Sequence, residues 1–312
     1  MQGVFFTCQL GKVLISVSSN KPALKHAPLA EETMKKLMTI MTACLVAGLA
    51  CADGSTVTSA NIVGYKQVTL NPGFNMIALN WQQVGYTGGV EQIAITNLFD
   101  PTEAAANLKV GVLSSITGIG VNHGDTIEVW NGIGYNTYFF CTNLFVGTTP
   151  VWVNNANTHV ATSDTIPLGL GFWLFHQGTA TNTVTLSGQV KFMGVAHQHV
   201  IEPGFNMIGS GFASDAPLND ARWTWASDGA VVGVLSSVTG IGVNHGDTIE
   251  VWNGIGYNTY FFCTNLFVGT TPVWVNNSNT HVATPDSVPL GSAVWYFHQG
   301  ASPIVLHEAQ PY

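Results

Sequence analysis

A long internal repeat constrains this chain more than any other feature. Residues 110–169 align with residues 232–291 at a constant offset of 122, and only five positions in that window of 60 differ. A weaker match precedes each copy, because Pro-Gly-Phe-Asn-Met-Ile occurs at 72–77 and again at 203–208. The period is too long for a solenoid repeat and has the size of a whole domain. The repeat therefore predicts two tandem domains.

Each repeat has the sequence pattern of a β-protein. Two runs rich in aromatic and β-branched residues, 126–130 and 135–141, flank an Asn-Gly turn, which is typical of a β-hairpin. Further strands are predicted at 63–70, 74–79, 150–153, 171–176 and 183–186. Short strands separated by Gly, Asn and Pro favour a sandwich or a barrel. We expect an all-β chain of two tandem sandwich-like or barrel-like domains, each with at most one short helix.

One helix is predicted in the first repeat, at 90–99, with a weak counterpart at 218–225 in the second.

Residues 34–52 have the features of a signal peptide. Lys35 and Lys36 precede an apolar run of 14 residues, 37–50, which ends in Ala50-Cys51-Ala52. This is a basic segment, a hydrophobic segment and an A-x-A cleavage site, and the run is shorter than the ~20 residues that a membrane span needs. The pattern predicts cleavage after Ala52 and export from the cell. A lipid anchor at Cys51 and an uncleaved anchor are the alternatives.

The position of the signal peptide defines the expected boundaries. Residues 1–33 precede it, and we interpret them as an extension from a mispredicted upstream start, with Met34 as the initiator. The first β-domain is then expected at 53–190 and the second at 191–312.

Charge excludes several classes of protein. Only 8% of the residues are charged, and residues 53–312 carry four basic and 15 acidic side chains, a net charge of −11. This acidic balance argues against nucleic acid as a partner. A hydrophobic content of 46% excludes intrinsic disorder. No run after residue 52 is apolar enough to span a membrane, and so little charge favours self-association.

Three segments of each repeat carry a resemblance to a known kind of protein. They are the opening segments 72–77 and 203–208, the hairpins 125–138 and 247–260, and the closing segments 167–173 and 289–295. Together they resemble tandem repeat domains of secreted bacterial proteins, in which a P-G-W-N-L-I motif, a V-W…Y hairpin and a P-G-x-G-[FY]-W motif follow one another. The second closing segment departs from this pattern, because Ser292-Ala293-Val294 replaces Leu170-Gly171-Phe172. The resemblance implies a non-catalytic β-module of the cell envelope or the extracellular space.

The predicted exported part has two cysteines, Cys141 and Cys263, at equivalent positions of the two copies. Export permits disulfides, but equivalent positions of tandem domains rarely come within the ~7 Å that a bridge requires. Buried free thiols, a disulfide between domains or chains, and a reactive or metal-binding role all remain open.

Aromatic residues on the hairpin and the following strand are the candidate ligand-binding residues. Exposed Trp and Tyr rings can stack on sugars, whereas the same residues also make good cross-strand pairs in a core. The candidates are Trp130, Tyr135, Trp152, Trp252, Tyr257 and Trp274.

The segment Asn122-His123-Gly124-Asp125 and its copy at 244–247 place an imidazole near a carboxylate. Such groups can serve zinc binding or acid–base catalysis, but Asn, Gly and Asp are also typical of a turn. His159 and His281, and likewise His176 and His298, could converge on the same end of each domain. Asp125 and Glu128 are poorly placed as paired catalytic carboxylates, because residues three apart on a strand face opposite sides. We predict no catalytic residues, no metal ligands and no cofactor.

The sequence therefore indicates an exported, non-catalytic protein that acts by binding or self-assembly, for example in adhesion. Its expected partners are an extracellular glycan or further copies of itself. A tandem carbohydrate-binding module is the first alternative, and a secreted hydrolase that uses His123 and Asp125 is the second.

Overall fold

The computed structural model describes residues 63–84, 91–112, 122–143, 145–191, 196–220, 223–224, 229–234, 244–265 and 267–310, together with Cys8–Gln9 and Lys12–Val13. The chain divides into two compact units, Met1–Thr58 and Ser59–Tyr312. In the first unit, β1 (Cys8–Gln9) pairs antiparallel with β2 (Lys12–Val13). The predicted signal peptide at 34–52 lies outside the described residues. No helix among the described residues is both long enough and apolar enough to cross a membrane.

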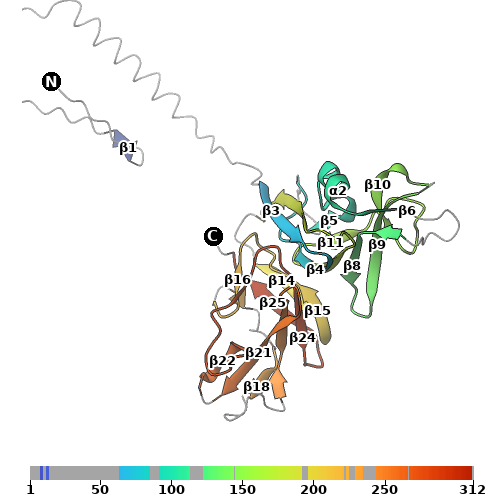
Figure 1. The fold of residues 1–312 in the computed structure, drawn as a ribbon. Coiled ribbons are helices and arrows are strands. Elements are labelled where there is room, and N and C mark those ends of the chain that lie inside the picture. The colour runs from blue at the N-terminus through green and yellow to red at the C-terminus, as the bar shows by residue number, and fades with distance from the viewer. Residues whose placement is uncertain are drawn as a thin grey trace, which may run out of the picture. The chain divides into compact units, whose positions relative to one another are not determined.

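The second unit contains both repeats, and a seven-stranded sheet dominates the first of them (Figure 1). Its hydrogen-bonded order is β4-β12-β8-β9-β6-β7, and β10 also pairs with β9. The strands are β4 (Gly73–Ala78), β6 (Val110–Val112), β7 (Asn122–Gly124), β8 (Thr126–Trp130), β9 (Tyr135–Asn143), β10 (Gly147–Asn154) and β12 (Gly171–His176). Only β6 and β9 pair in parallel within this sheet.

Two strand pairs and two short helices cover the inner face of the sheet. They are the pairs β3 (Val63–Leu70) with β13 (Asn182–Gln189) and β5 (Gln92–Ala94) with β11 (Thr165–Pro167), the 3-10 helix η1 (Ile95–Asn97) and the helix α2 (Pro101–Asn107). Apolar side chains from both layers form one core, for example Leu70, Ile127, Phe172, Leu174 and Leu186. The first repeat is thus a two-layer β-structure with its own core.

The second repeat has the same topology, so the chain is all-β with two tandem β-domains, as predicted. Its large sheet has the order β15-β24-β20-β21-β18-β19, and β22 also pairs with β21. These strands are β15 (Gly204–Ile208), β18 (Val232–Val234), β19 (Asn244–Gly246), β20 (Thr248–Trp252), β21 (Tyr257–Asn265), β22 (Gly269–Asn276) and β24 (Val294–His298). The flanking strands are β14 (His197–Ile201), β16 (Ala216–Pro217), β17 (Trp223–Thr224), β23 (Ser287–Val288) and β25 (Ile304–Glu308).

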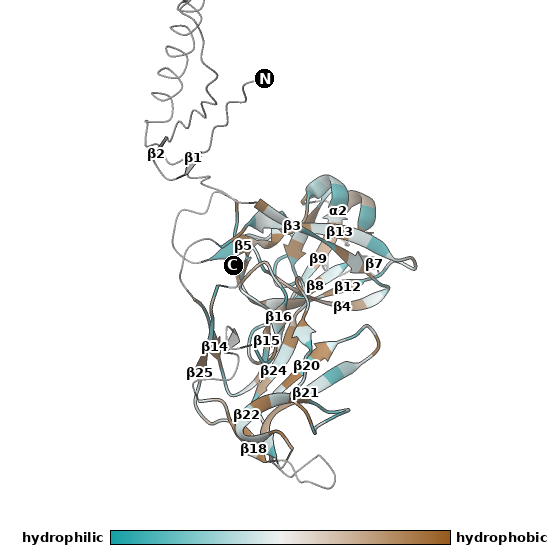
Figure 2. Cartoon of the chain, turned by 90° about the vertical axis from the view of Figure 1, so that its left-hand side faces the viewer, coloured by the Kyte–Doolittle hydropathy of each residue, from teal (hydrophilic) through white to brown (hydrophobic). Residues whose placement is uncertain are grey.

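The predicted hairpin is confirmed in both repeats. In the first, β8 and β9 pair Trp130 with Tyr135 across the turn. The Asn131 side chain accepts hydrogen bonds from the Ile133 and Gly134 N–H groups, and Gly132 has a φ of 94° that favours glycine. In β8 and β20 (Figure 2), Ile and Val alternate with Thr, Glu and Trp, so each large sheet has one face for the core and one outer face.

The predicted helix at 90–99 is wrong. Residues 92–94 form β5, and the helix α2 begins only at Pro101. Asp100 caps it by accepting hydrogen bonds from the Thr102 and Glu103 N–H groups, so Asp-Pro-Thr-Glu was the start signal that periodicity missed. In the second repeat, the described part of 218–225 contains no helix, and Trp223–Thr224 pair with β25 instead.

Candidate binding site at the junction of the repeats

The outer faces of the two large sheets meet in contacts that occur twice. The indole Nε1 of Trp130 donates a hydrogen bond to the Phe205 carbonyl oxygen at 2.9 Å. In return, the indole Nε1 of Trp252 donates to the Phe74 carbonyl oxygen at 3.2 Å. Trp130 is equivalent to Trp252, and Phe74 is equivalent to Phe205. Each repeat therefore gives the same donor and the same acceptor to the other. This reciprocity is the mark of an isologous, two-fold interface.

Backbone contacts at the junction show the same reciprocity. The Ala78 N–H donates to the Gly291 carbonyl at 3.0 Å, and the Gly209 N–H donates to the Gly169 carbonyl at 2.8 Å. Two isolated β-bridges, Ile77 with Ser292 and Leu170 with Ile208, are also equivalent to each other across the two repeats. The junction therefore resembles the interface of a symmetric dimer, built within one chain.

Buried apolar side chains form a separate core at the junction. They are Met76, Ala78, Trp173, Met207, Ala293 and Trp295. Two glycines permit the close approach of the sheets. A Cβ atom on Gly209 would lie 2.1 Å from the Ala78 Cβ, and a Cβ on Gly171 would lie 2.5 Å from the Ala293 Cβ. The two repeats therefore pack against each other and are not independent domains joined only by a linker.

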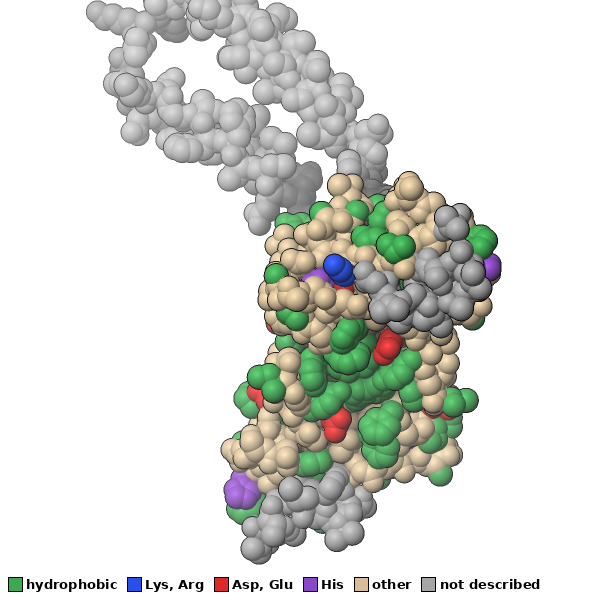
Figure 3. Space-filling model, turned by 45° about the vertical axis from the view of Figure 1, so that its right-hand side comes forward, with side chains coloured by type: hydrophobic (Ala, Val, Ile, Leu, Met, Phe, Trp, Pro, Cys, Tyr) green, Lys and Arg blue, Asp and Glu red, His purple; other side chains and the backbone are tan. Residues whose placement is uncertain are grey.

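Aromatic rings from both repeats extend from this core to the surface. Phe74 and Phe205 are 47% and 50% exposed, and Tyr135 and Tyr257 are 41% exposed. We define the junction surface by two equivalent sets of ring contacts and one glutamate in each repeat: Phe74, Glu128, Trp130, Tyr135, Trp173, Phe175, Phe205, Glu250, Trp252, Tyr257, Trp295 and Phe297. Figure 3 shows hydrophobic side chains gathered over a broad area of one face, with acidic side chains at its margin.

Strand periodicity explains why these residues share a face. In β8, Ile127 and Val129 are buried in the first core, so the alternate residues Glu128 and Trp130 point to the outer face. Across the sheet, Trp173 lies opposite Glu128. The order of the strands thus places each glutamate beside a tryptophan.

The predicted ligand-binding aromatics divide into two groups. Trp130, Tyr135, Trp252 and Tyr257 lie on the junction surface. Trp152 and Trp274 are only 3% and 1% exposed and belong to the cores of their repeats. A buried ring offers no face to a ligand, so including these two tryptophans was wrong.

Sequence reasoning missed the phenylalanines and two tryptophans of the junction surface. Phe74 packs against Trp173 and Phe175, with ring centroids 5.6 Å and 4.7 Å away. The alternation of Trp173 and Phe175 in β12 was a signal that they share one face. Only the pairing of β12 with β4 could add Phe74 to that face.

Cys141 and Cys263 are free, fully buried thiols in separate apolar clusters. Desolvation raises the pKa of each thiol to about 11, which suppresses the reactive thiolate. Of the three alternatives, the structure favours buried free thiols over a disulfide or a reactive role.

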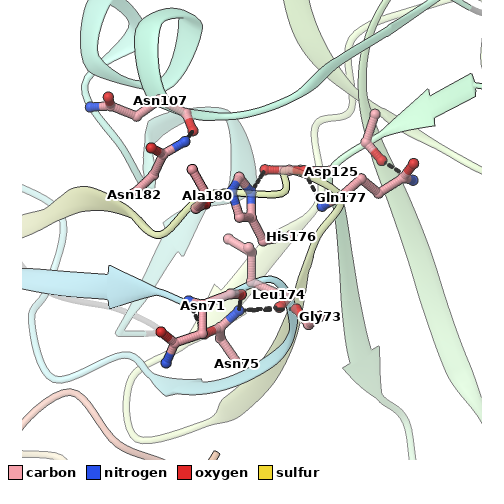
Figure 4. Close-up of polar contacts among 11 residues, drawn as sticks. Asn71, Gly73, Asn75, Asn107, Asp125, Leu174, His176, Gln177, Ala180 and Asn182 are labelled. Atoms are coloured by element: carbon pink, nitrogen blue, oxygen red, sulfur yellow. Dashed lines mark hydrogen bonds and ion pairs between the residues drawn. The ribbon is translucent and has the colours of Figure 1, made fainter.

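A buried histidine–aspartate pair lies in each repeat, and Figure 4 shows the pair of the first repeat. Asp125 and His176 are 2.7 Å apart, and the second ring nitrogen of His176 lies 3.2 Å from the Ala180 carbonyl oxygen. Both ring nitrogens of His176 therefore lie within hydrogen-bonding distance of oxygen atoms. The Gln177 N–H donates to the other carboxylate oxygen at 2.7 Å. The equivalent pair is Asp247 with His298, at 2.8 Å.

These pairs change the interpretation of the Asn-His-Gly-Asp segments. Gly124 has a φ of 73°, and a Cβ there would lie 2.3 Å from the Gly111 nitrogen, so a tightly packed backbone requires glycine. The Asp125 side chain is fully buried. It forms hydrogen bonds with His176 and Gln177 instead of forming a turn. The side chain of His123 lies outside what the structure describes.

A second buried polar cluster lies at the start of the second repeat. The imidazoles of His197 and His199 have ring centroids 4.5 Å apart. His197 Nδ1 lies 3.3 Å from Lys191 Nζ and 3.6 Å from Glu91 Oε2, and His199 Nε2 lies 3.6 Å from Glu308 Oε1. Burial lowers the pKa of His197, while hydrogen bonding from His197 and Lys191 lowers the pKa of Glu91 to about 2.

Acid should therefore weaken this cluster. The folded state favours neutral His197, so its contribution to stability is present above the unfolded pKa of about 6.5 and is lost as pH falls below that value. Glu91 contributes a further loss of stability as pH falls from its unfolded pKa of 4.5 to its folded pKa of about 2. We expect His197→Gln to reduce the fall in Tm between pH 7 and pH 5 by a few degrees, since 1 kcal/mol corresponds to about 2–4 °C.

Thermal unfolding followed by circular dichroism at pH 7, 6 and 5 would measure this effect. The exposed His159, stacked on Phe145, provides the control substitution His159→Gln, which should leave the pH profile unchanged. An identical fall in Tm for His197→Gln and the unmodified chain would contradict the assignment.

A cavity of about 340 Å³ adjoins the junction surface. It lies between β3 and the turn at 289–292, and Lys66, Asn71 and Trp252 are among its lining residues. At the equivalent place across the junction, His197 and His199 approach Gly169 closely, where a Cβ would lie 2.4–2.5 Å from their rings. The histidines thus make the two sides of the junction unequal.

Comparison of the chain with protein-family models, curated proteins and solved structures found no match. Among the described residues, no group of three His, Cys, Asp or Glu side chains is placed to hold a metal ion. The chemistry that the junction surface offers is ring stacking, with hydroxyl groups and carboxylates between the rings. This is the chemistry of a binding surface.

Proposed function

We propose that this chain is an exported, non-catalytic protein of the cell envelope or extracellular space, and that it binds a carbohydrate chain on the junction surface. One observation carries the proposal: partly exposed rings of both repeats, Phe74 and Tyr135 with their equivalents Phe205 and Tyr257, belong to one junction. Exposed aromatic area of this kind marks binding surfaces on proteins. Two repeats then act as one extended surface rather than as two separate modules.

Polar groups among the rings support a saccharide as the ligand. Tyr135 and Tyr257 offer hydroxyl groups, and Glu128 and Glu250 offer hydrogen-bond acceptors. Sugar rings combine apolar faces with hydroxyl groups, so they match a surface of this composition. The resemblance to repeat domains of secreted bacterial proteins is consistent with an extracellular glycan.

Retention on insoluble polysaccharides tests this function. We expect the double variant Phe74→Ala/Phe205→Ala to bind at least about tenfold more weakly, a loss of about 1.4 kcal/mol. The matched control is Phe145→Ala/Phe267→Ala, because these rings are similarly exposed but stack on His159 and His281, away from the junction surface. Equal retention of both double variants would overturn the proposal.

Self-assembly through the same surface is the second candidate. The large exposed rings and the charge content of only 8% favour it, since little repulsion opposes contact between copies. Light scattering of the purified chain distinguishes the two functions. A regular assembly that Phe74→Ala/Phe205→Ala dissolves would support self-assembly, and a monomer would support ligand binding. Reductant should change neither result, because both thiols are buried and free.

A further inference from the structure

Glu128 and Glu250 are the two carboxylates of the junction surface. Glu128 lies between Trp173 on β12 and Thr137 on β9, and Glu250 lies between the equivalent residues of the second repeat. Both side chains are partly buried. In the part of the chain that the structure describes, neither carboxylate has a hydrogen bond or an ion pair. Burial raises the pKa of both carboxyl groups, which shows that their charged forms lose solvation there.

Ring contacts connect the surroundings of the two glutamates. Trp130 lies 5.7 Å from Trp295, the residue opposite Glu250, and Trp252 lies 5.6 Å from Trp173, the residue opposite Glu128. Burial is the main cause that raises the pKa of Tyr257, and the charge of Glu250 and the neighbouring Tyr135 add to it. Burial and the charge of Glu128 act in the same direction on Tyr135. Each tyrosine ring also contacts a tryptophan, Trp130 at 5.2 Å or Trp252 at 5.1 Å between centroids. Carboxylates, hydroxyl groups and ring faces of both repeats therefore lie close together.

A cation would complement this arrangement. A partly desolvated carboxylate gains from an opposite charge, and the face of an aromatic ring also attracts a cation. The chain supplies few cations of its own, because residues 53–312 contain only four basic side chains. One of them, Lys191, is paired with Glu91 at 2.9 Å. The net charge of −8 over the whole chain also attracts a cationic ligand.

We propose that the junction surface binds a saccharide chain with protonated amino groups, and that Glu128 and Glu250 pair with the ammonium groups between the aromatic rings. This proposal rests on the proposed function and adds the chemical class of the ligand. The rings bind the sugar faces, and the two carboxylates select the charged amino sugar over its neutral, acylated form.

Two oligosaccharides that differ only in this charge provide the test. A hexamer of glucosamine and a hexamer of N-acetylglucosamine have the same backbone, but only the first carries ammonium groups near pH 6. Titration calorimetry on the full chain at low salt should show about tenfold tighter binding of the glucosamine hexamer, a difference of about 1.4 kcal/mol. The double variant Glu128→Gln/Glu250→Gln should lose this preference, so that its affinities for the two hexamers become about equal.

The control variant is Glu202→Gln, which removes an exposed carboxylate that belongs to no junction contact. It should keep the preference, and a loss as large as that of the double variant would overturn the proposal in favour of overall charge. The unmodified chain could instead bind both hexamers equally, and Phe74→Ala/Phe205→Ala could lose binding of both hexamers. This result would overturn the amino-group proposal but leave carbohydrate binding intact. If the chain bound neither hexamer and no insoluble polysaccharide, both the amino-group proposal and the proposed carbohydrate binding would be overturned.

Discussion

Substitution of Asp247 by alanine is expected to lower the free energy of unfolding by about 3–5 kcal/mol. The carboxylate is fully buried and accepts hydrogen bonds from the His298 ring at 2.8 Å, the Tyr296 hydroxyl at 2.9 Å and the Gln299 N–H at 2.9 Å. Its removal leaves the buried His298 ring and the buried Tyr296 hydroxyl without their partner. Such uncompensated groups cost more than the original pair contributed.

Denaturant titration at pH 7 would measure this loss, and the first repeat supplies a comparison. Asp125 has no tyrosine partner, because Leu174 stands where the second repeat has Tyr296. Asp125→Ala should therefore cost less than Asp247→Ala. The double variant Asp247→Leu/His298→Leu should recover part of the stability, since no charge is left unpaired. A loss below about 1 kcal/mol for Asp247→Ala, the size of an ordinary surface hydrogen bond, would contradict the assignment.

The junction gives the second large effect. Trp295→Ala should cost about 3–5 kcal/mol, the usual range for a buried tryptophan, and should separate the unfolding of the two repeats. The Trp295 ring lies 5.7 Å from the Trp130 ring and 5.8 Å from the Phe205 ring, so its loss opens a cavity in the core that joins the repeats. Calorimetry should then resolve two transitions, whereas the unmodified unit should unfold in one.

A substitution that adds a single methyl group makes this test specific to the junction. Gly209→Ala places a Cβ 2.1 Å from the Ala78 Cβ, and overpacking of this kind costs about 1–3 kcal/mol. Gly134→Ala is the matched control, because its Cβ would meet no atom within 4 Å. One transition of unchanged midpoint for both Trp295→Ala and Gly209→Ala would show that the repeats unfold independently of their contact.

The hairpins and most strands could be predicted because their signals are local. The Asn-Gly turn and its flanking aromatic runs specify β8 and β9, and the Pro-Gly turn specifies the start of β4. The helix was misplaced because its start signal, Asp100-Pro101 followed by Glu103, lies beyond the predicted range of 90–99. Residues 92–94 became a strand through pairing with β11, a contact more than 70 positions away in the chain.

The sites were harder to predict because they depend on contacts between distant strands. Asp125 and His176 come from different strands, and nothing in the local pattern distinguishes this buried pair from a turn aspartate and a surface histidine. Trp152 and Trp130 are both tryptophans of predicted strands. Only the layer that covers each face shows that Trp152 lies in the core and Trp130 at the junction.

The sequence by itself determined the duplication, the all-β class and the strands, because each follows from residue type and spacing along a short stretch of chain. The tertiary structure alone decided that the two repeats share one pseudo-two-fold junction. The physical reason is that an outer sheet face can either remain in solvent or be buried against a partner, and the alternation of side chains is the same in both cases. Small residues at Gly171 and Gly209, opposite Ala293 and Ala78, allow the second outcome, and that packing assembles the rings and glutamates of both repeats on one surface.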